Sequence, residues 1–297
     1  MPTATCDFRF SLQNRYARSA LVNQLEGLGI TNGAVTFSGR ATMGEKTISI
    51  GDFVAANAKQ IRTRFRRFIK DNDVPRADDL VILDMEPETF APRQLGDYEG
   101  KLQRQLIAAY RLRIEVARTV LESEGFAGRL GLYQVIAPDG RGRLSTGFLR
   151  RMCGYLAAGE QGMYDALDVI CPVLYQRFGA NDAPDGTLDE WVADATRQGI
   201  DGSLALTRRN GDAIPLVPIL SFWVFNGGSD SNRFAVRPAR VARQLEIVQG
   251  GDGIEAIVFW SAWQTKQEMR EAPDPVEEIA ITGFLTATGS LPWPGCP

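Results

Sequence analysis

Seven strand-like segments alternate with helical patterns along the chain, and this alternation constrains the fold more than any other feature. The expected strands are Cys6–Phe10, Ala34–Ser38, Leu80–Asp84, Arg129–Ile136, Leu167–Tyr175, Pro215–Trp223 and Glu255–Ser261. The expected helices are Tyr16–Leu28, Phe53–Ile69, Leu95–Ser123, Gly147–Ala158, Leu188–Gln198 with an extension through Leu206, Pro238–Val248 and Val276–Leu285. Strand-then-helix units without internal hairpins predict a parallel sheet. At 297 residues and 44% hydrophobic content, we expect one α/β domain, residues 1–297, forming a closed or nearly closed (β/α) barrel of TIM type.

The composition excludes several kinds of site and partner. The chain has no histidine, so Ser-His-Asp and Cys-His catalysis and histidine-ligated zinc are excluded. Its four cysteines contain no Cys-x-x-Cys motif, which disfavours a zinc ribbon. The net charge of −3, without a basic tail, argues against binding to nucleic acid or to a membrane surface. We expect no metal, no cofactor and no membrane-spanning helix.

Compartment and crosslinking stay open. The start MPTATCDFRF has no charged region followed by an apolar one, so we expect no signal peptide in it. Secretion or action at the cell envelope remains open if a leader precedes this sequence. Cys6 and Cys296 either form a bridge between the first strand and the tail or are free thiols, and the same question applies to Cys153 and Cys171.

The segment Leu80–Glu88, LVILDMEPE, carries the clearest chemical signal. Its aliphatic residues predict a buried parallel strand that ends in acidic residues. Side chains alternate along a strand, so Asp84 and Glu86 point the same way, about 6 to 7 Å apart. Two such carboxyl groups hinder each other's ionisation, which allows one of them to act as an acid. An ordinary strand end with solvated acids is the alternative.

In parallel barrels the functional site lies at the carboxyl ends of the strands. The polar and aromatic residues at these ends are Asp84, Glu86, Tyr133, Gln134, Tyr175, Gln176, Trp223, Trp260 and Trp263. Aromatic rings stack on the apolar faces of sugars, while phenol and amide groups bind the substituents. The strand ends therefore predict a glycan site, with Arg177 among the arginines in the following loops as a candidate contact to an anionic sugar.

Five strand ends together resemble the hyaluronidase family of glycoside hydrolases. LDMEPE resembles that family's Asp-Trp-Glu signature, and GLYQVIAPD resembles its Gly-Tyr-Tyr strand. CPVLYQR, VPILSFW and AIVFWSAW resemble its Pro-Ser-Val-Tyr-Leu, Leu-Pro-Tyr-Tyr-Trp and Ile-Ile-Trp-Gly-Ser strands, in the same order. The resemblance covers some two thirds of the chain and implies a distorted barrel of about seven parallel strands. Met85 departs from the family's Trp, and Ser261 departs from its Gly.

This resemblance implies a retaining endo-glycosidase acting on a polysaccharide with N-acetylhexosamine units. Glu86 would be the general acid and base, and Asp84 would share a proton with it and orient the 2-acetamido group. The acetamido oxygen would be the nucleophile, which is a known exception to the two-carboxylate scheme. Tyr175 would hold the acetamido group, and Tyr133 and Trp260 would line the subsite.

Alternatives remain for these residues and for the function. Tyr133 and Tyr175 are otherwise aromatic residues that cap the core, Trp223 is a wall of the cleft or plain core, and Glu88 is the second candidate acid. Trp260 and Trp263 lie three residues apart, so both cannot point into a barrel, and we favour Trp260. A glycosidase of other specificity, muramidase-like or arabinan-cleaving, would use Asp84 and Glu86 directly. A non-catalytic sugar-binding barrel is the third possibility.

Overall fold

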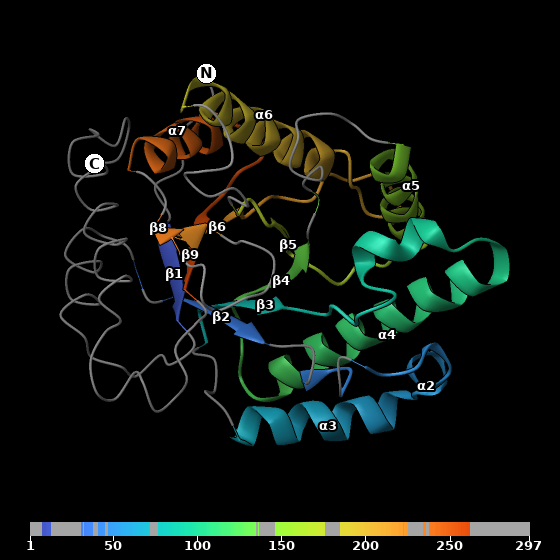
Figure 1. Cartoon of the computed structure of the whole chain (residues 1–297). Helices are drawn as coiled ribbons and strands as arrows, with labels where there is room; N and C mark the ends of the chain where they lie inside the picture. Colours follow the sequence, from blue (N-terminus) through green and yellow to red (C-terminus); the bar gives the residue numbers. More distant parts are fainter. Residues whose placement is uncertain are drawn as a thin grey trace.

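The computed structural model describes an α/β fold built largely from parallel strands (Figure 1). It describes residues 8–12, 31, 33–37, 41–44, 47–71, 77–134, 136, 146–175, 185–221, 223–224, 234–235 and 238–261. The elements are, in order, β1 (Phe8–Leu12), β2 (Ala34–Phe37), α2 (Ile50–Ala55), α3 (Ala58–Asp71), β3 (Leu80–Leu83), the 3-10 helix η2 (Pro92–Asp97), α4 (Gly100–Ser123), β4 (Arg129–Gln134), α5 (Thr146–Glu160), β5 (Val169–Pro172), α6 (Asp185–Leu204), β6 (Ile219–Ser221), β7 (Trp223–Val224), β8 (Phe234–Ala235), α7 (Pro238–Gln249) and β9 (Ile257–Ser261).

The parallel strands form two sheets. One sheet has the order β2-β3-β4-β5 and the other the order β1-β9-β6, with parallel pairing throughout. Isolated parallel bridges link the sheets, Ile170 to Leu216 and Val173 to Ile219 on one side and Arg9 to Thr31 on the other. No continuous ladder closes the described strands into a barrel. The prediction of parallel α/β architecture is confirmed, whereas a closed ring of strands is not seen.

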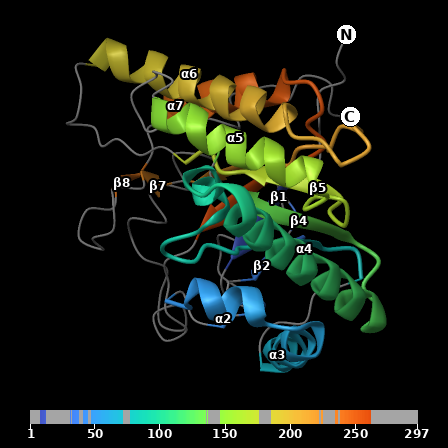
Figure 2. The ribbon, with the colours of Figure 1, turned by 90° about the vertical axis from the view of Figure 1, so that its right-hand side faces the viewer.

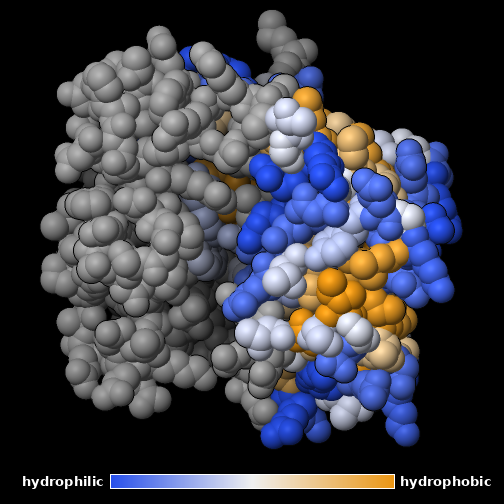
Figure 3. All heavy atoms as spheres, turned by 45° about the vertical axis from the view of Figure 1, so that its right-hand side comes forward, coloured by the Kyte–Doolittle hydropathy of each residue, from blue (hydrophilic) through white to orange (hydrophobic). Residues whose placement is uncertain are grey.

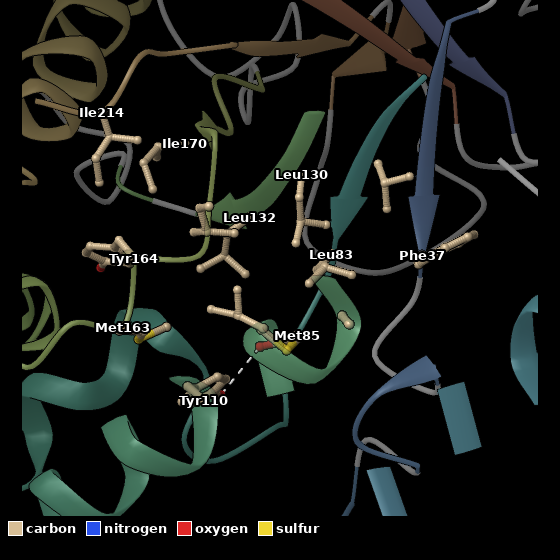
Figure 4. Close-up of a cluster of buried hydrophobic side chains, with 14 of the residues drawn as sticks. Phe37, Leu83, Met85, Tyr110, Leu130, Leu132, Met163, Tyr164, Ile170 and Ile214 are labelled. Carbon is tan, nitrogen blue, oxygen red and sulfur yellow. Dashed lines mark hydrogen bonds between the residues drawn. The ribbon is translucent and has the colours of Figure 1, made fainter. Parts of the chain in front are cut away.

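The two faces of these strands pack into different cores. The inner core is made mostly of small and β-branched side chains: Ala34, Leu80, Ile82, Val169, Cys171, Val173, Val217, Ile219, Ala256 and Val258. The outer core lies between the strands and the helices and contains larger side chains, including Leu83, Met85, Leu132 and Tyr164 (Figure 4). Figures 1 and 2 show the helices arranged around the outside of the strands. Alternate residues of one strand therefore enter different environments.

Glycine at position 131 leaves room for side chains of the neighbouring strand inside the inner core. A Cβ placed at Gly131 would lie 2.6 Å from the sulfur of Cys171 on the neighbouring strand β5. Burial raises the pKa of this Cys171 thiol, which keeps it protonated. Cys153 is exposed, and both cysteines are free thiols. The possible Cys153–Cys171 bridge is therefore absent.

One helix expected from the sequence is two helices in the structure. The prediction of a single helix over Phe53–Ile69 is wrong, because α2 ends at Ala55 and α3 starts at Ala58. Asn57 and Gln60 form a reciprocal capping box at this break: each backbone N–H donates to the other's side-chain oxygen, at 3.0 and 3.1 Å. Similarly, the expected Leu95–Ser123 helix is divided into η2 and α4.

A short antiparallel pair interrupts the strand-then-helix pattern. β7 pairs with β8, with Trp223 opposite Ala235 and Val224 opposite Phe234. The expectation of no internal hairpin is wrong at this point, and the expected strand Pro215–Trp223 is divided into β6 and β7. The predicted helices Tyr16–Leu28 and Val276–Leu285, together with Cys6 and Cys296, lie outside the described residues.

The surface over α4 and α5 is mixed, with apolar side chains among hydrophilic ones (Figure 3). Its large exposed apolar residues are Leu102 of α4 and Leu149 and Leu156 of α5. Isolated exposed leucines are common on protein surfaces. Of the helices in the described part of the chain, none combines the length and apolarity required to span a membrane.

Candidate active site

The two carboxylates at the end of β3 emerge on the inner side of the strand. Val81, Leu83 and Met85 belong to the outer core, whereas Leu80 and Ile82 belong to the inner core. This period of two assigns Asp84 and Glu86 to the inner side. The backbone N–H of Asp84 donates to the Phe37 carbonyl at 2.8 Å, which extends the β2–β3 pairing by one residue. Both carboxylates are only partly buried.

A buried tyrosine fixes the backbone on both sides of Glu86. The hydroxyl of Tyr110, from α4, donates to the Phe90 carbonyl at 2.9 Å and lies 3.4 Å from the Met85 carbonyl oxygen (Figure 4). Burial raises the pKa of Tyr110 well above its ordinary value, and the nearby negative charge of Glu86 contributes. Tyr110 therefore remains a neutral donor that holds the loop after β3 in place.

Glu86 forms an ion pair with Arg93 of η2. The guanidinium Nη1 donates to Glu86 Oε1, in a short contact between side chains that are 37% and 22% exposed, respectively. The two residues lie seven apart, and the intervening chain turns back through the buried Pro92. The ion pair therefore anchors one oxygen of the carboxylate while the group stays accessible to solvent.

Three aromatic side chains gather on the same inner side. The rings of Tyr175 and Trp260 are stacked, with centroids 5.2 Å apart and an interplanar angle of 12°. The ring of Tyr133 meets Tyr175 edge-on, with centroids 6.4 Å apart and an angle of 62°. All three pack against the inner core. Together they form an apolar wall at the carboxyl ends of β4, β5 and β9.

The electrostatics of Tyr175 connect this wall to the carboxylates. Burial is the largest cause that raises the pKa of Tyr175 well above its ordinary value. A hydrogen bond with Tyr133 and the charges of Asp84 and Glu86 raise it further. Both carboxylates are therefore close enough to act on the phenol, and Tyr175 stays protonated at neutral pH. This brings Asp84, Glu86, Tyr133, Tyr175 and Trp260 into one cluster.

The structure does not bring Gln134 into this cluster. Its side chain is 1% exposed, and its Nε2 donates to the Tyr164 hydroxyl at 3.1 Å, in the outer core. Gln134 follows Tyr133 directly on β4, so the two side chains point to opposite faces, and its role as a substrate contact stays a prediction. Glu88 is exposed.

The remaining predicted contacts lie in the short strand β7 or outside the described residues. The backbone of Trp223 lies in β7, beyond the end of β6. Gln176, Arg177 and Trp263 lie outside the described residues. Within the described part of the chain, no group of three or more cysteine, aspartate or glutamate side chains is arranged to hold a metal ion.

Sequence reasoning missed the pairing of Arg93 with Glu86 and the position of Tyr155 near that carboxylate. Arg93 is one of several arginines in predicted loops, and its pairing with Glu86 depends on the turn through η2. Tyr155 of α5 is fully buried, and its pKa is raised well above its ordinary value by burial, by Tyr164 and by Glu86. In the sequence, Tyr155 is indistinguishable from a core aromatic residue, because helical spacing alone places it on the packed face.

The cluster contains the parts needed for acid chemistry on a sugar. A partly exposed carboxylate, a second carboxylate two residues away and a neutral phenol donor lie beside stacked aromatic rings. Carboxyl groups transfer protons to and from glycosidic oxygens, and aromatic faces bind sugar rings.

Comparison with known structures finds a similar fold in bee venom hyaluronidase. Bee venom hyaluronidase superimposes with a TM-score of 0.59 at 11% sequence identity, covering 93% of this chain and 99% of that chain. A second structure of bee venom hyaluronidase, in complex with a hyaluronic acid tetramer, gives a TM-score of 0.62 at 10% identity, covering 97% of this chain and 98% of that chain. This chain shares the bee venom hyaluronidase fold.

At such low identity, the likeness to bee venom hyaluronidase concerns the fold alone. No protein-family model matches the chain, and no curated protein matches it by sequence. The chemistry of this chain therefore has to be argued from its own residues.

Proposed function

We propose that this protein is a retaining endo-glycosidase that hydrolyses a polysaccharide containing N-acetylhexosamine, with Glu86 as acid and base. The observation that carries the proposal is the environment of Tyr175. Its hydroxyl is buried, the negative charges of Asp84 and Glu86 raise its pKa, and its ring is stacked on Trp260. A protonated phenol beside two carboxylates is suited to hold a polar substituent of a sugar whose ring lies near the aromatic wall.

In the proposed first step, the acetamido oxygen of the substrate attacks the anomeric carbon of the same sugar. The glycosidic C–O bond breaks as Glu86 gives its proton to the departing oxygen, and a cyclic oxazolinium ion forms. Tyr175 donates a hydrogen bond that orients the acetamido group, and Asp84 balances the positive charge that develops on its nitrogen. These roles demand a neutral Tyr175, which agrees with the raised pKa of this group.

In the proposed second step, water opens the oxazolinium ring at the anomeric carbon. Glu86, now a carboxylate, takes a proton from this water, and the acetamido group is restored. Two inversions at one carbon give net retention of configuration. The product is a saturated oligosaccharide with a new reducing end.

The same proposal extends to the architecture and the substrate. We take residues 1–297 as one domain, a distorted (β/α) barrel whose two sheets meet at the Ile170–Leu216 and Arg9–Thr31 bridges. Hyaluronan is the first substrate to test, because the related fold has been solved with a hyaluronic acid tetramer.

The test is product analysis on purified hyaluronan, chondroitin, chitin oligomers, peptidoglycan and arabinan, with and without a thiazoline mimic of the cyclic intermediate. We expect saturated oligosaccharides from a polymer with N-acetylhexosamine, and inhibition by the thiazoline, since only substrate assistance passes through such a ring. Cleavage of arabinan alone would contradict the acetamido mechanism. Binding without cleavage on the whole panel would point to a sugar-binding barrel instead.

A further inference from the structure

The ion pair between Arg93 and Glu86 needs an explanation beyond stability. Its two side chains are partly exposed, and exposed ion pairs contribute little to stability because water screens the charges. The pair nevertheless joins the central carboxylate of the cluster to η2, an element that makes no strand and carries no other residue of the site. This points to a role in placing Glu86 rather than in holding the fold together.

Contacts from three directions hold η2 in place. Within the turn, the Gln94 side-chain oxygen accepts from the Ala91 backbone N–H at 2.8 Å. From α4, Gln103 Nε2 donates to the Leu95 carbonyl at 2.9 Å. From α5, Arg150 Nε donates to the Gly96 carbonyl at 3.0 Å. A short 3-10 turn with such support is a firm base for the side chain of Arg93.

The contact between η2 and α5 runs from backbone to backbone. A Cβ added at Gly96 would lie 1.9 Å from the Arg150 carbonyl oxygen, and one added at Gly154 would lie 2.1 Å from the Gly96 nitrogen. Neither glycine has a positive φ, so glycine is needed here for the close approach rather than for the turn. In Figure 2 this part of the chain, in teal, lies beside α5. The backbone of η2, and with it the start of the Arg93 side chain, is thus fixed against α5.

We propose that Arg93 is a positioning residue: η2, seated on α5 through Gly96 and Gly154, places its guanidinium on Oε1 of Glu86 and thereby aims Oε2 at the glycosidic oxygen. The proposal rests on the role of Glu86 under Proposed function. A carboxylic acid that carries its proton on Oε2 still accepts a hydrogen bond at Oε1, so the contact with Arg93 can persist through proton transfer. A carboxylate held in one orientation does not lose rotational freedom on reaching the transition state, which lowers the entropic cost of the reaction.

The test is a double-mutant cycle on hyaluronan hydrolysis. Arg93→Gln is expected to lower kcat by about 30-fold, with KM changed less than about twofold, because a misplaced catalytic group costs up to about 100-fold. Arg93→Lys is expected to regain part of the rate, since lysine supplies the charge without the planar fork. In a Glu86→Gln background, Arg93→Gln should change the residual rate less than about twofold. Equal fold losses in both backgrounds would show a general structural role and overturn the proposal.

The matched control is Arg243→Gln on α7. Arg243 also forms an exposed ion pair, with Glu246 at 2.7 Å, but the pair lies within one helix outside the cluster. Its loss is expected to leave kcat and KM unchanged. A loss equal to that of Arg93→Gln would mean that removing any surface arginine lowers the rate, and would contradict the proposal.

A crystal structure of Arg93→Gln decides the same question without an activity assay. The Glu86 carboxylate is expected to leave its present orientation, while η2 and α5 keep their contact. An unchanged Glu86 side chain would overturn the role of Arg93. If the wild-type protein cleaves no polymer, the proposed function fails, and this structural comparison still tells whether Arg93 orients Glu86.

Discussion

The inner and outer faces of the parallel strands use the same residue types for different purposes. On the outer face, Tyr110 and Tyr164 are buried, and their hydroxyls bond to backbone carbonyls or to a neighbouring amide. On the inner face, Tyr133 and Tyr175 pack beside Trp260, and the charges of Asp84 and Glu86 raise the pKa of Tyr175. Tyrosine on the outer face holds elements together, whereas tyrosine on the inner face presents a polar group beside Asp84 and Glu86.

Three consecutive residues make the contrast sharpest. Met85 is fully buried in the outer core, and its neighbours Asp84 and Glu86 emerge on the other side. One side chain thus packs in the outer core, while the side chains before and after it face the site. Substitutions on the inner side should change chemistry with little effect on stability, and substitutions on the outer side should do the reverse. The following predictions test that division.

The largest effect is expected from Glu86→Gln. The amide keeps the shape of the side chain but cannot give a proton, so kcat should fall by about 10³-fold with the melting temperature unchanged. Steady-state kinetics on hyaluronan measure this loss. Glu88→Gln is the matched control: Glu88 is exposed two residues further on, and its variant should keep the wild-type rate. A larger loss of kcat in Glu88→Gln than in Glu86→Gln would show that Glu88 is the general acid.

A smaller loss of rate is expected from Tyr175→Phe. Removing a buried hydroxyl that orients the substrate should lower kcat by about 10²-fold, as loss of a single preorganised donor typically does. Tyr164→Phe removes a hydroxyl from the outer face, where it accepts from Gln134. That variant should lose about 1 kcal/mol of unfolding free energy and retain its kcat within about threefold. Equal effects of the two variants on kcat would contradict the claim that only the inner face takes part in the reaction.

Met85→Ala should act on stability instead of rate. Truncating a buried methionine leaves a cavity and should reduce the free energy of unfolding by about 2–4 kcal/mol. Met85→Leu, which nearly conserves volume, should cost less than about 1.5 kcal/mol. Urea unfolding followed by circular dichroism gives both values. If folded Met85→Ala protein lost activity as severely as Glu86→Gln, the outer side chain would belong to the site as well.

Alkaline pH should destabilise the fold through its buried tyrosines. Burial raises the pKa of Tyr110, Tyr155 and Tyr175 well above the ordinary value near 10 that they regain on unfolding. Below about pH 10 both states hold these protons, so the stability is fully present. Above it only the unfolded chain releases them, and each such tyrosine removes about 1.4 kcal/mol per pH unit until its folded pKa is reached.

Urea unfolding between pH 8 and pH 11 measures this slope. Tyr155→Phe is the matched variant, because it removes one titrating group from the outer face and should reduce the slope by one tyrosine's share. A free energy of unfolding that stays constant to pH 11 would contradict the burial of these phenols.

The sequence predicted the strands well because each is a short aliphatic run with a clear boundary. All seven expected strands overlap strands of the described chain. The charges of both Asp84 and Glu86 act on Tyr175. The break between α2 and α3 was also readable, since Asn57 followed by Gln60 three residues later is a capping signal. Hydrophobic spacing alone bridges such a break, which explains the error.

The residues of the site could be predicted only where the alternation of side chains along a strand was applied strictly. Tyr133 and Gln134 are adjacent on β4, so only one of them can face the inner side, and the structure selects Tyr133. The contact of Arg93 with Glu86 could not be predicted, because it depends on how η2 packs against α5 through Gly96 and Gly154. Packing between backbones leaves no pattern in hydrophobicity or charge.

The most direct test of the account is the configuration of the first product formed from hyaluronan. Proton nuclear magnetic resonance, recorded in the first minutes of digestion, distinguishes the anomers before they equilibrate. We predict a saturated oligosaccharide whose new N-acetylglucosamine reducing end is β, as in the substrate. Initial formation of the α anomer would contradict the substrate-assisted role of Asp84, Glu86 and Tyr175. An unsaturated product would show that the enzyme cleaves by elimination, and it would contradict hydrolysis.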